Sequence, residues 1–187
     1  ALVGGSLLFS LSSCQSTPSR TVERPSDSSL APSSTSPSTY GAEALETRVV
    51  ESRARDGVGV GIPVLLPVGL SPEWAIVEAG LDPSRQVWRM KLLNRSNGDT
   101  VEVVQQATSV KALVASEGVE KELESVDLST WQLGMWDSYQ TKSDDFLIVS
   151  RAGKRSAVGV RAQSVDKAIE VAKSLISFDT GKPQVLD

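Results

Sequence analysis

The chain has 187 residues, of which 19 are basic and 23 acidic and none is histidine, so its net charge is -4. This length fits one ordinary domain with appended segments, and the mild acidity argues against a nucleic-acid-binding protein, which would carry a strong basic stripe. A single cysteine and no histidine exclude a Ser-His or Cys-His catalytic pair, a zinc site of His or Cys ligands and an intrachain disulfide. We expect no metal and no cofactor.

The chain begins with an uncharged apolar segment, residues 1–13. Its length matches the apolar region of a secretory signal peptide and is too short to span a bilayer as a helix. No basic segment precedes it and the first residue is not Met. We interpret it as a signal peptide that lacks its first residues.

The segment ends in Leu11-Ser12-Ser13-Cys14, which resembles the lipobox of bacterial lipoproteins. The resemblance implies that Cys14 is acylated, for example with palmitate, and becomes the first residue of the mature protein. The domain would then be attached by a lipid anchor to the cell membrane or, since Gln15 is not an aspartate, the outer membrane, on its extracytoplasmic side. Several acyl chains would anchor it firmly. The alternative is a buried cysteine after an ordinary apolar segment.

Residues 15–40 favour a disordered tether, because 17 of the 26 are Ser, Thr or Pro. A coil of this length would hold a domain roughly 25–30 Å from its anchor. Residues 42–56 are ambiguous between a short helix, with Gly57 as its stop, and an edge strand, and we prefer a helix or a partly ordered lead-in. The expected organisation is a signal peptide at 1–13, a tether and lead-in at 14–57, a globular domain at 58–178 and a tail at 179–187.

The globular part begins with an extended apolar run, Ile62–Pro67, whose two prolines exclude a helix and disfavour a central strand. Alternation of apolar and polar residues predicts three strands next, with Asn97-Gly98 as a tight turn before the third. These strands are 74–80, 87–93 and 100–106.

The second half predicts a helix, three strands and a final helix. The first helix covers 108–120 with Ser109 as its cap, and the strands cover 129–136, 145–150 and 155–161. Ser164 caps the last helix, 165–178, whose apolar stripe needs a sheet to cover; the stripe is Ile169, Ala172, Leu175 and Ile176. The fold class is therefore α+β, an antiparallel sheet of about five or six strands with a C-terminal helix packed across it. The stretch 146–178 resembles the ends of small envelope lipoproteins, which supports this fold and location.

Two groups of residues are candidate ligand contacts. Trp131 and Trp136 could form a stacking platform, although packing in the core is the alternative for each tryptophan. Arg151, Lys154 and Arg155 form a basic hairpin tip that could contact anionic headgroups or wall polymer, or could simply be a solvated turn.

One short motif points to catalysis. Ser164-x-x-Lys167 matches the serine–lysine pattern of penicillin-interacting enzymes, but the partner motifs of that family are absent. We therefore prefer the alternative, an N-cap serine with a solvated lysine.

The sequence leads us to expect a non-enzymatic envelope lipoprotein, a surface-tethered binding or accessory module. The alternative is a carrier or sensor of apolar ligands in a cavity between helix and sheet, and a hydrolase comes third. The expected partners are the membrane, through the anchor, and another envelope protein, wall polymer or lipid, with no nucleic acid.

Overall fold

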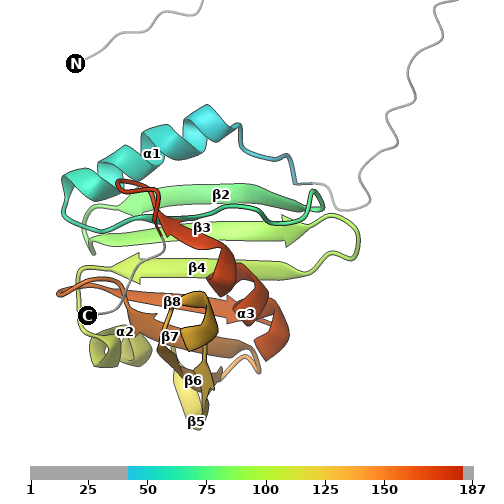
Figure 1. Cartoon of the computed structure of the whole chain (residues 1–187), viewed down its shortest axis with the longest axis vertical. Coiled ribbons are helices and arrows are strands. Elements are labelled where there is room, and N and C mark those ends of the chain that lie inside the picture. Colours follow the sequence, from blue (N-terminus) through green and yellow to red (C-terminus); the bar gives the residue numbers. More distant parts are fainter. Residues whose placement is uncertain (1–41, 183–187) are drawn as a thin grey trace, which may run out of the picture. The chain divides into compact units, whose positions relative to one another are not determined.

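The computed structural model describes residues 42–182, and Cys14 and the tether lie outside them. Seven strands of this part form one antiparallel sheet in the order β2-β3-β4-β8-β7-β6-β5 (Figure 1). The α+β class is confirmed, with seven strands where five or six were expected. In chain order they are β2 (Trp74–Asp82), β3 (Val87–Asn94), β4 (Thr100–Gln106), β5 (Val119–Asp127), β6 (Met135–Thr141), β7 (Phe146–Arg151) and β8 (Ala157–Ala162).

The two faces of the sheet carry separate apolar cores. One face is covered by helix α1 (Thr47–Gly59), helix α3 (Val165–Ser174) and a short two-stranded ribbon, β1 (Leu65–Pro67) with β9 (Leu175–Ser177). The other face is covered only in part, by helix α2 (Val110–Ser116). Because side chains alternate along a strand, Val158 and Val160 of β8 belong to the first core, while Gly159 faces Leu113 of α2.

Helix α1 belongs to the folded domain, so the boundary expected at Val58 is wrong and the domain begins upstream of it. Val50, Ala54 and Gly57 recur at helical spacing and are buried. The helix does not stop at Gly57 but runs on to Gly59. Gly57 instead allows a close approach, because a Cβ there would lie 2.6 Å from Cγ2 of Val64.

The hairpin of β3 and β4 is the best confirmed prediction. Trp88, Met90 and Leu92 are buried at every second position, whereas Arg89 between them is exposed. The turn differs in detail, because only Gly98 has a positive φ (82°) and its N–H donates to the carbonyl of Asn94. It is therefore a longer turn than the two-residue type.

The C-terminal helix is shorter than predicted. It begins after Ser164, whose hydroxyl accepts from the Lys167 N–H as expected, but it ends at Ser174 instead of 178. Leu175–Ser177 turns extended because it pairs with β1, and Val68 N–H donates to the Ser174 carbonyl at 2.8 Å. The predicted stripe is correspondingly split between a helix and a strand.

Gln105 fastens the ribbon to the sheet. This side chain is fully buried, and its carbonyl accepts from the Leu65 N–H at 2.7 Å while its amide donates to the Leu65 carbonyl at 2.9 Å. The side chain amide thus pairs with β1 as a neighbouring strand would, and no buried backbone group of Leu65 is left without a partner.

The region between α2 and β6 was predicted incorrectly. The helix expected to reach 120 ends at Ser116, before Gly118 at φ 67°, and β5 follows, which the sequence did not indicate. The strand expected at 129–136 begins only at Met135, because Ser129–Trp131 forms a single 3-10 turn. Strand β5 is mostly exposed and rich in Glu, so it lacks the apolar alternation by which half-buried strands are recognised.

Candidate functional site

A groove of about 750 Å³ opens on the covered face of the sheet, beside the first half of α1. Its walls are α1, the loop 68–73 between β1 and β2, and β9 with the residues that follow it. Figure 1 shows the segment after α3 crossing toward α1, which brings the two ends of the domain together here. The volume lies within the range of small-molecule sites.

The groove is lined mainly by large apolar side chains that the protein covers incompletely. Val68 is the most open of them, with 57% of its surface exposed. The others are half-buried: Leu45, Leu66, Leu70, Ile76, Ile176 and Phe178. Leu66 and Ile176 are opposite each other in the ribbon, and since side chains alternate they point away from the side on which Leu65 is buried.

The groove has few charged residues. Two of them are Glu51, which is half-buried, and Arg95, which is exposed. Glu51 lies 4.0 Å from Arg55, whose guanidinium carbon is 5.9 Å from the ring centre of Phe178. Arg95 is exposed, and its backbone N–H donates to the Glu73 carbonyl. The interior therefore offers apolar contact, and the chemistry suits an apolar ligand with few polar groups.

The contact between α3 and the sheet is solid. Ala168, Val171, Ala172 and Leu175 are buried, and the gap beneath the end of the helix is only about 10 Å³. The alternative interpretation from the sequence placed a cavity between this helix and the sheet, and within the described residues no cavity of ligand size is found beneath α3. The space for a ligand lies at α1 and the ribbon.

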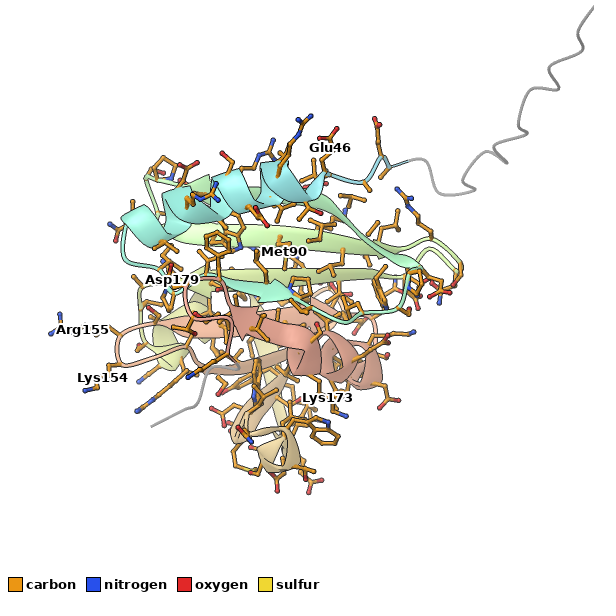
Figure 2. All side chains as sticks on the ribbon, turned by 45° about the horizontal axis from the view of Figure 1, so that its top comes forward. Glu46, Met90, Lys154, Arg155, Lys173 and Asp179 are labelled. Carbon is orange, nitrogen blue, oxygen red and sulfur yellow. The ribbon has the colours of Figure 1, made fainter. Side chains whose placement is uncertain are left out.

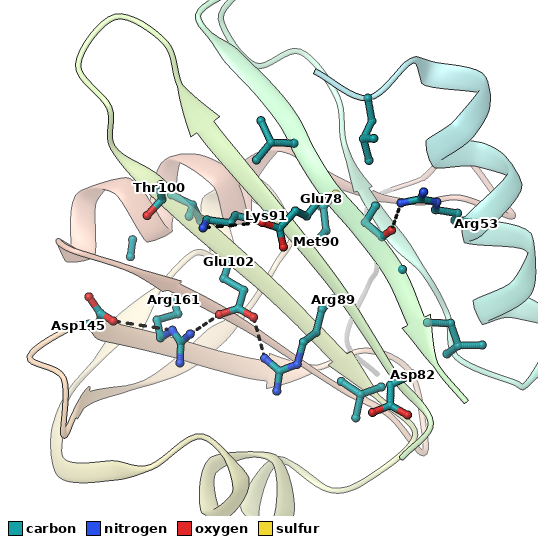
Figure 3. Close-up of a pocket in the computed structure, with 18 residues that line it drawn as sticks. Arg53, Glu78, Asp82, Arg89, Met90, Lys91, Thr100, Glu102, Asp145 and Arg161 are labelled. Carbon is teal, nitrogen blue, oxygen red and sulfur yellow. Dashed lines mark hydrogen bonds and ion pairs between the residues drawn. The ribbon is translucent and has the colours of Figure 1, made fainter. Parts of the chain in front are cut away.

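A second hollow, of about 840 Å³, lies on the open part of the other face, over β2, β3 and β4 (Figure 3). It holds a chain of ion pairs. Arg89 bonds to Glu102 at 2.8 Å and to Glu117 at 2.7 Å. Arg161 pairs with Glu102 and lies 3.6 Å from Glu117 and 3.8 Å from Asp145.

These charges neutralise one another. Burial alone would lower the pKa of Arg89, but its hydrogen bonds to Glu117 and Glu102 outweigh burial and raise the pKa above its ordinary value. Glu117, with only 4% of its side chain exposed, is held by two arginines, as a buried carboxylate requires. Lys91 and Glu78 also face each other at 4.0 Å. The network stabilises an open sheet face and leaves little net charge to attract an ion.

The two candidate tryptophans do not form a platform. Trp136 is 3% exposed, belongs to the core and donates its indole N–H to the Leu133 carbonyl at 3.0 Å, so it cannot stack on a ligand. Trp131 is 46% exposed, and Nζ of Lys173 lies 3.5 Å from its ring centre. One ring face of Trp131 is thus already occupied by a cation.

The basic tip is where the sequence placed it, at the connection of β7 and β8, with Arg151 ending β7 and Lys154 and Arg155 in the turn. Arg151, Lys154 and Arg155 are exposed. In Figure 2 the side chains of Lys154 and Arg155 point away from the domain.

The serine–lysine pattern is a helix cap. The hydroxyl of Ser164 accepts from the backbone of Lys167, while Nζ of Lys167 lies 3.6 Å from the carboxylates of Asp99 and Glu170. Lys167 is therefore paired with acids and does not activate the serine.

Within residues 42–182, no helix is long and apolar enough to cross a membrane. Within the same residues, His, Cys, Asp and Glu nowhere gather in a group of three or more that could hold a metal ion.

The sequence reasoning missed the groove residues. Leu66, Val68 and Leu70 follow Val64 and Leu65, which are buried, so the run 62–70 holds more apolar side chains than one side of an extended segment can bury. That excess was the available signal. No such signal marked Leu45 and Phe178, because these two residues come together only through the fold of the whole domain.

Comparisons with protein-family models, with curated proteins and with solved structures each found no match.

Proposed function

We propose that this protein is a binding module that carries or senses an apolar ligand, held in the groove between α1 and the β1–β9 ribbon. The observation that carries the proposal is the row of incompletely buried apolar side chains around a space of about 750 Å³. Each Å² of apolar surface that a ligand covers contributes about 25 cal/mol. A ligand would cover side chains that water otherwise contacts.

Of the two functions expected from the sequence, the groove supports the carrier or sensor over a general accessory role. Among the expected partners it supports a lipid, because an acyl chain would cover the incompletely buried apolar side chains of the groove. The proposal includes the lipid anchor at Cys14, which would hold such a module at the extracytoplasmic surface of the membrane that supplies its ligand.

A fluorescence titration with N-phenyl-1-naphthylamine, an uncharged apolar dye that brightens in apolar surroundings, tests the groove. Leu70→Asn places an amide in the groove wall. Ile169→Asn is the matched control, because Ile169 is also half-buried but lies on α3, outside the groove. We expect Leu70→Asn to weaken dye binding at least about tenfold and Ile169→Asn to leave it unchanged.

Ala44→Phe is a second variant that fills the groove without removing a packed side chain, since Ala44 lines it and is half-buried. Thermal melts verify that each variant is folded. If the wild type does not brighten the dye, or if folded Leu70→Asn and Ala44→Phe bind it as the wild type does, the groove is not the binding site.

A further inference from the structure

The β7–β8 hairpin carries basic residues and no acidic ones. Residues 146–165 include four arginines or lysines and no Asp or Glu. Arg161 is neutralised by carboxylates of other elements, Glu102, Glu117 and Asp145. Within residues 42–182, no carboxylate oxygen lies within 4.0 Å of a charged nitrogen of Arg151, Lys154 or Arg155, whereas such pairs occur for Arg89, Lys91 and Lys167.

The backbone beneath these three cations is fixed. The Ala152 N–H donates to the Ser156 carbonyl at 2.8 Å, both residues are buried, and Gly153 at φ 80° makes the turn between them. Lys154 and Arg155 extend from this closed turn away from the domain (Figure 2). Binding at the tip would therefore order side chains only, without the larger cost of ordering a loop.

Other exposed lysines without an ion pair in the described part are dispersed. Lys111 lies on α2, Lys121 on β5, Lys142 in the turn after β6 and Lys182 after β9. The tip instead places three free cations within five residues, on a protein whose net charge is -4. A local positive charge on an acidic protein favours one orientation of the domain next to an anionic partner.

We propose that the β7–β8 tip, made of Arg151, Lys154 and Arg155, binds the anionic phosphate headgroups of a lipid bilayer. Guanidinium groups bind phosphate oxygens in pairs and lysine supplies a point charge. Lys154 and Arg155 project from the domain beside Arg151 at the end of β7, so the tip presents its charges to a surface and does not enclose a molecule. Each basic side chain next to an anionic bilayer strengthens binding about fivefold, which corresponds to about 1 kcal/mol. Three of them give up to about a hundredfold at low salt, a reversible contact and not an anchor. The inference does not depend on the groove.

Co-sedimentation of the 187-residue chain with vesicles tests this contact. The vesicles are pure phosphatidylcholine or equal parts phosphatidylcholine and phosphatidylglycerol, and the difference between them removes any contribution of apolar segments. The test variant is Arg151→Gln with Lys154→Gln and Arg155→Gln. The matched control is Lys111→Gln with Lys121→Gln and Lys142→Gln, which removes the same charge from exposed side chains that have no ion pair.

We expect the wild type and the control to prefer anionic vesicles by at least about tenfold at low salt and the tip variant to lose that preference. Raising the salt to physiological strength, where the screening length is about 8 Å, should reduce the preference. Equal losses in both variants would mean that only net charge matters. No preference in the wild type, or binding of soluble polyphosphate without binding to vesicles, would also overturn the proposal.

Discussion

Replacing Gly57 by alanine tests how closely α1 approaches β1. In an exposed helix position this change is favourable, because glycine is about 1 kcal/mol less favourable than alanine within a helix. At Gly57, however, the new Cβ would lie 2.6 Å from Cγ2 of Val64 and 3.5 Å from the ring of Trp88. Carbon atoms normally approach to about 3.5–4.0 Å, so α1 or Val64 must move by about 1 Å.

Neither partner can move freely. Val64 is 1% exposed and Trp88 fully buried, and a β-branched side chain has few alternative rotamers. Overpacking of this kind costs about 1–3 kcal/mol. Subtracting the gain in helix propensity leaves a net loss of about 0–2 kcal/mol, and the burial of both partners places our expectation at about 1–2 kcal/mol.

Gly59→Ala is the control in the same helix. A Cβ there has no neighbour within 4 Å, so we expect a gain of about 0.4–1 kcal/mol. Urea titrations followed by tryptophan fluorescence measure the free energy of unfolding of both variants. The slope of that free energy against urea concentration should be the same as in the wild type. The reasoning is refuted if Gly57→Ala is as stable as Gly59→Ala, because the close contact with Val64 would then have no effect on stability.

Three further outcomes are expected. Gln105→Ala should cost about 2–4 kcal/mol in a urea titration, because it leaves the N–H and carbonyl of buried Leu65 without partners; a loss below about 1 kcal/mol would mean that water replaces the amide. Leu175→Ala should cost about 2–5 kcal/mol, since the interface beneath it is solid, and a negligible loss would show that β9 is not docked. Cys14→Ser should release the protein from membranes if the lipobox prediction is correct, and an unchanged membrane fraction with an unchanged mass would contradict it.

The parts of the fold that were predicted correctly are those whose signal is local. Trp88, Met90 and Leu92 alternate with polar neighbours, and Ser109 and Ser164 cap the helices that follow them. These patterns depend on side chains within a few residues of one another. The strand order could not be read in the same way, because β4 pairs with β8 across more than fifty residues.

The failures have a common cause in partners distant along the chain. Leu175–Ser177 continues a helical pattern, but β1 offers it a strand partner more than a hundred residues away. Strand β5 is an edge strand with mostly polar, exposed side chains, which protects an edge from further pairing and also hides it from a search for apolar alternation. The groove was missed for the same reason, because its walls come from both ends of the domain.

That construction makes the groove a late product of synthesis. One wall lies at residues 44–51 and the opposite one at 176–181, so a chain still being made can complete the central hairpins before the groove exists. Loss of the last few described residues would leave most of the sheet intact and remove one side of the groove. If the groove binds the proposed apolar ligand, proteolysis near Phe178 should abolish binding while the seven-stranded sheet stays folded.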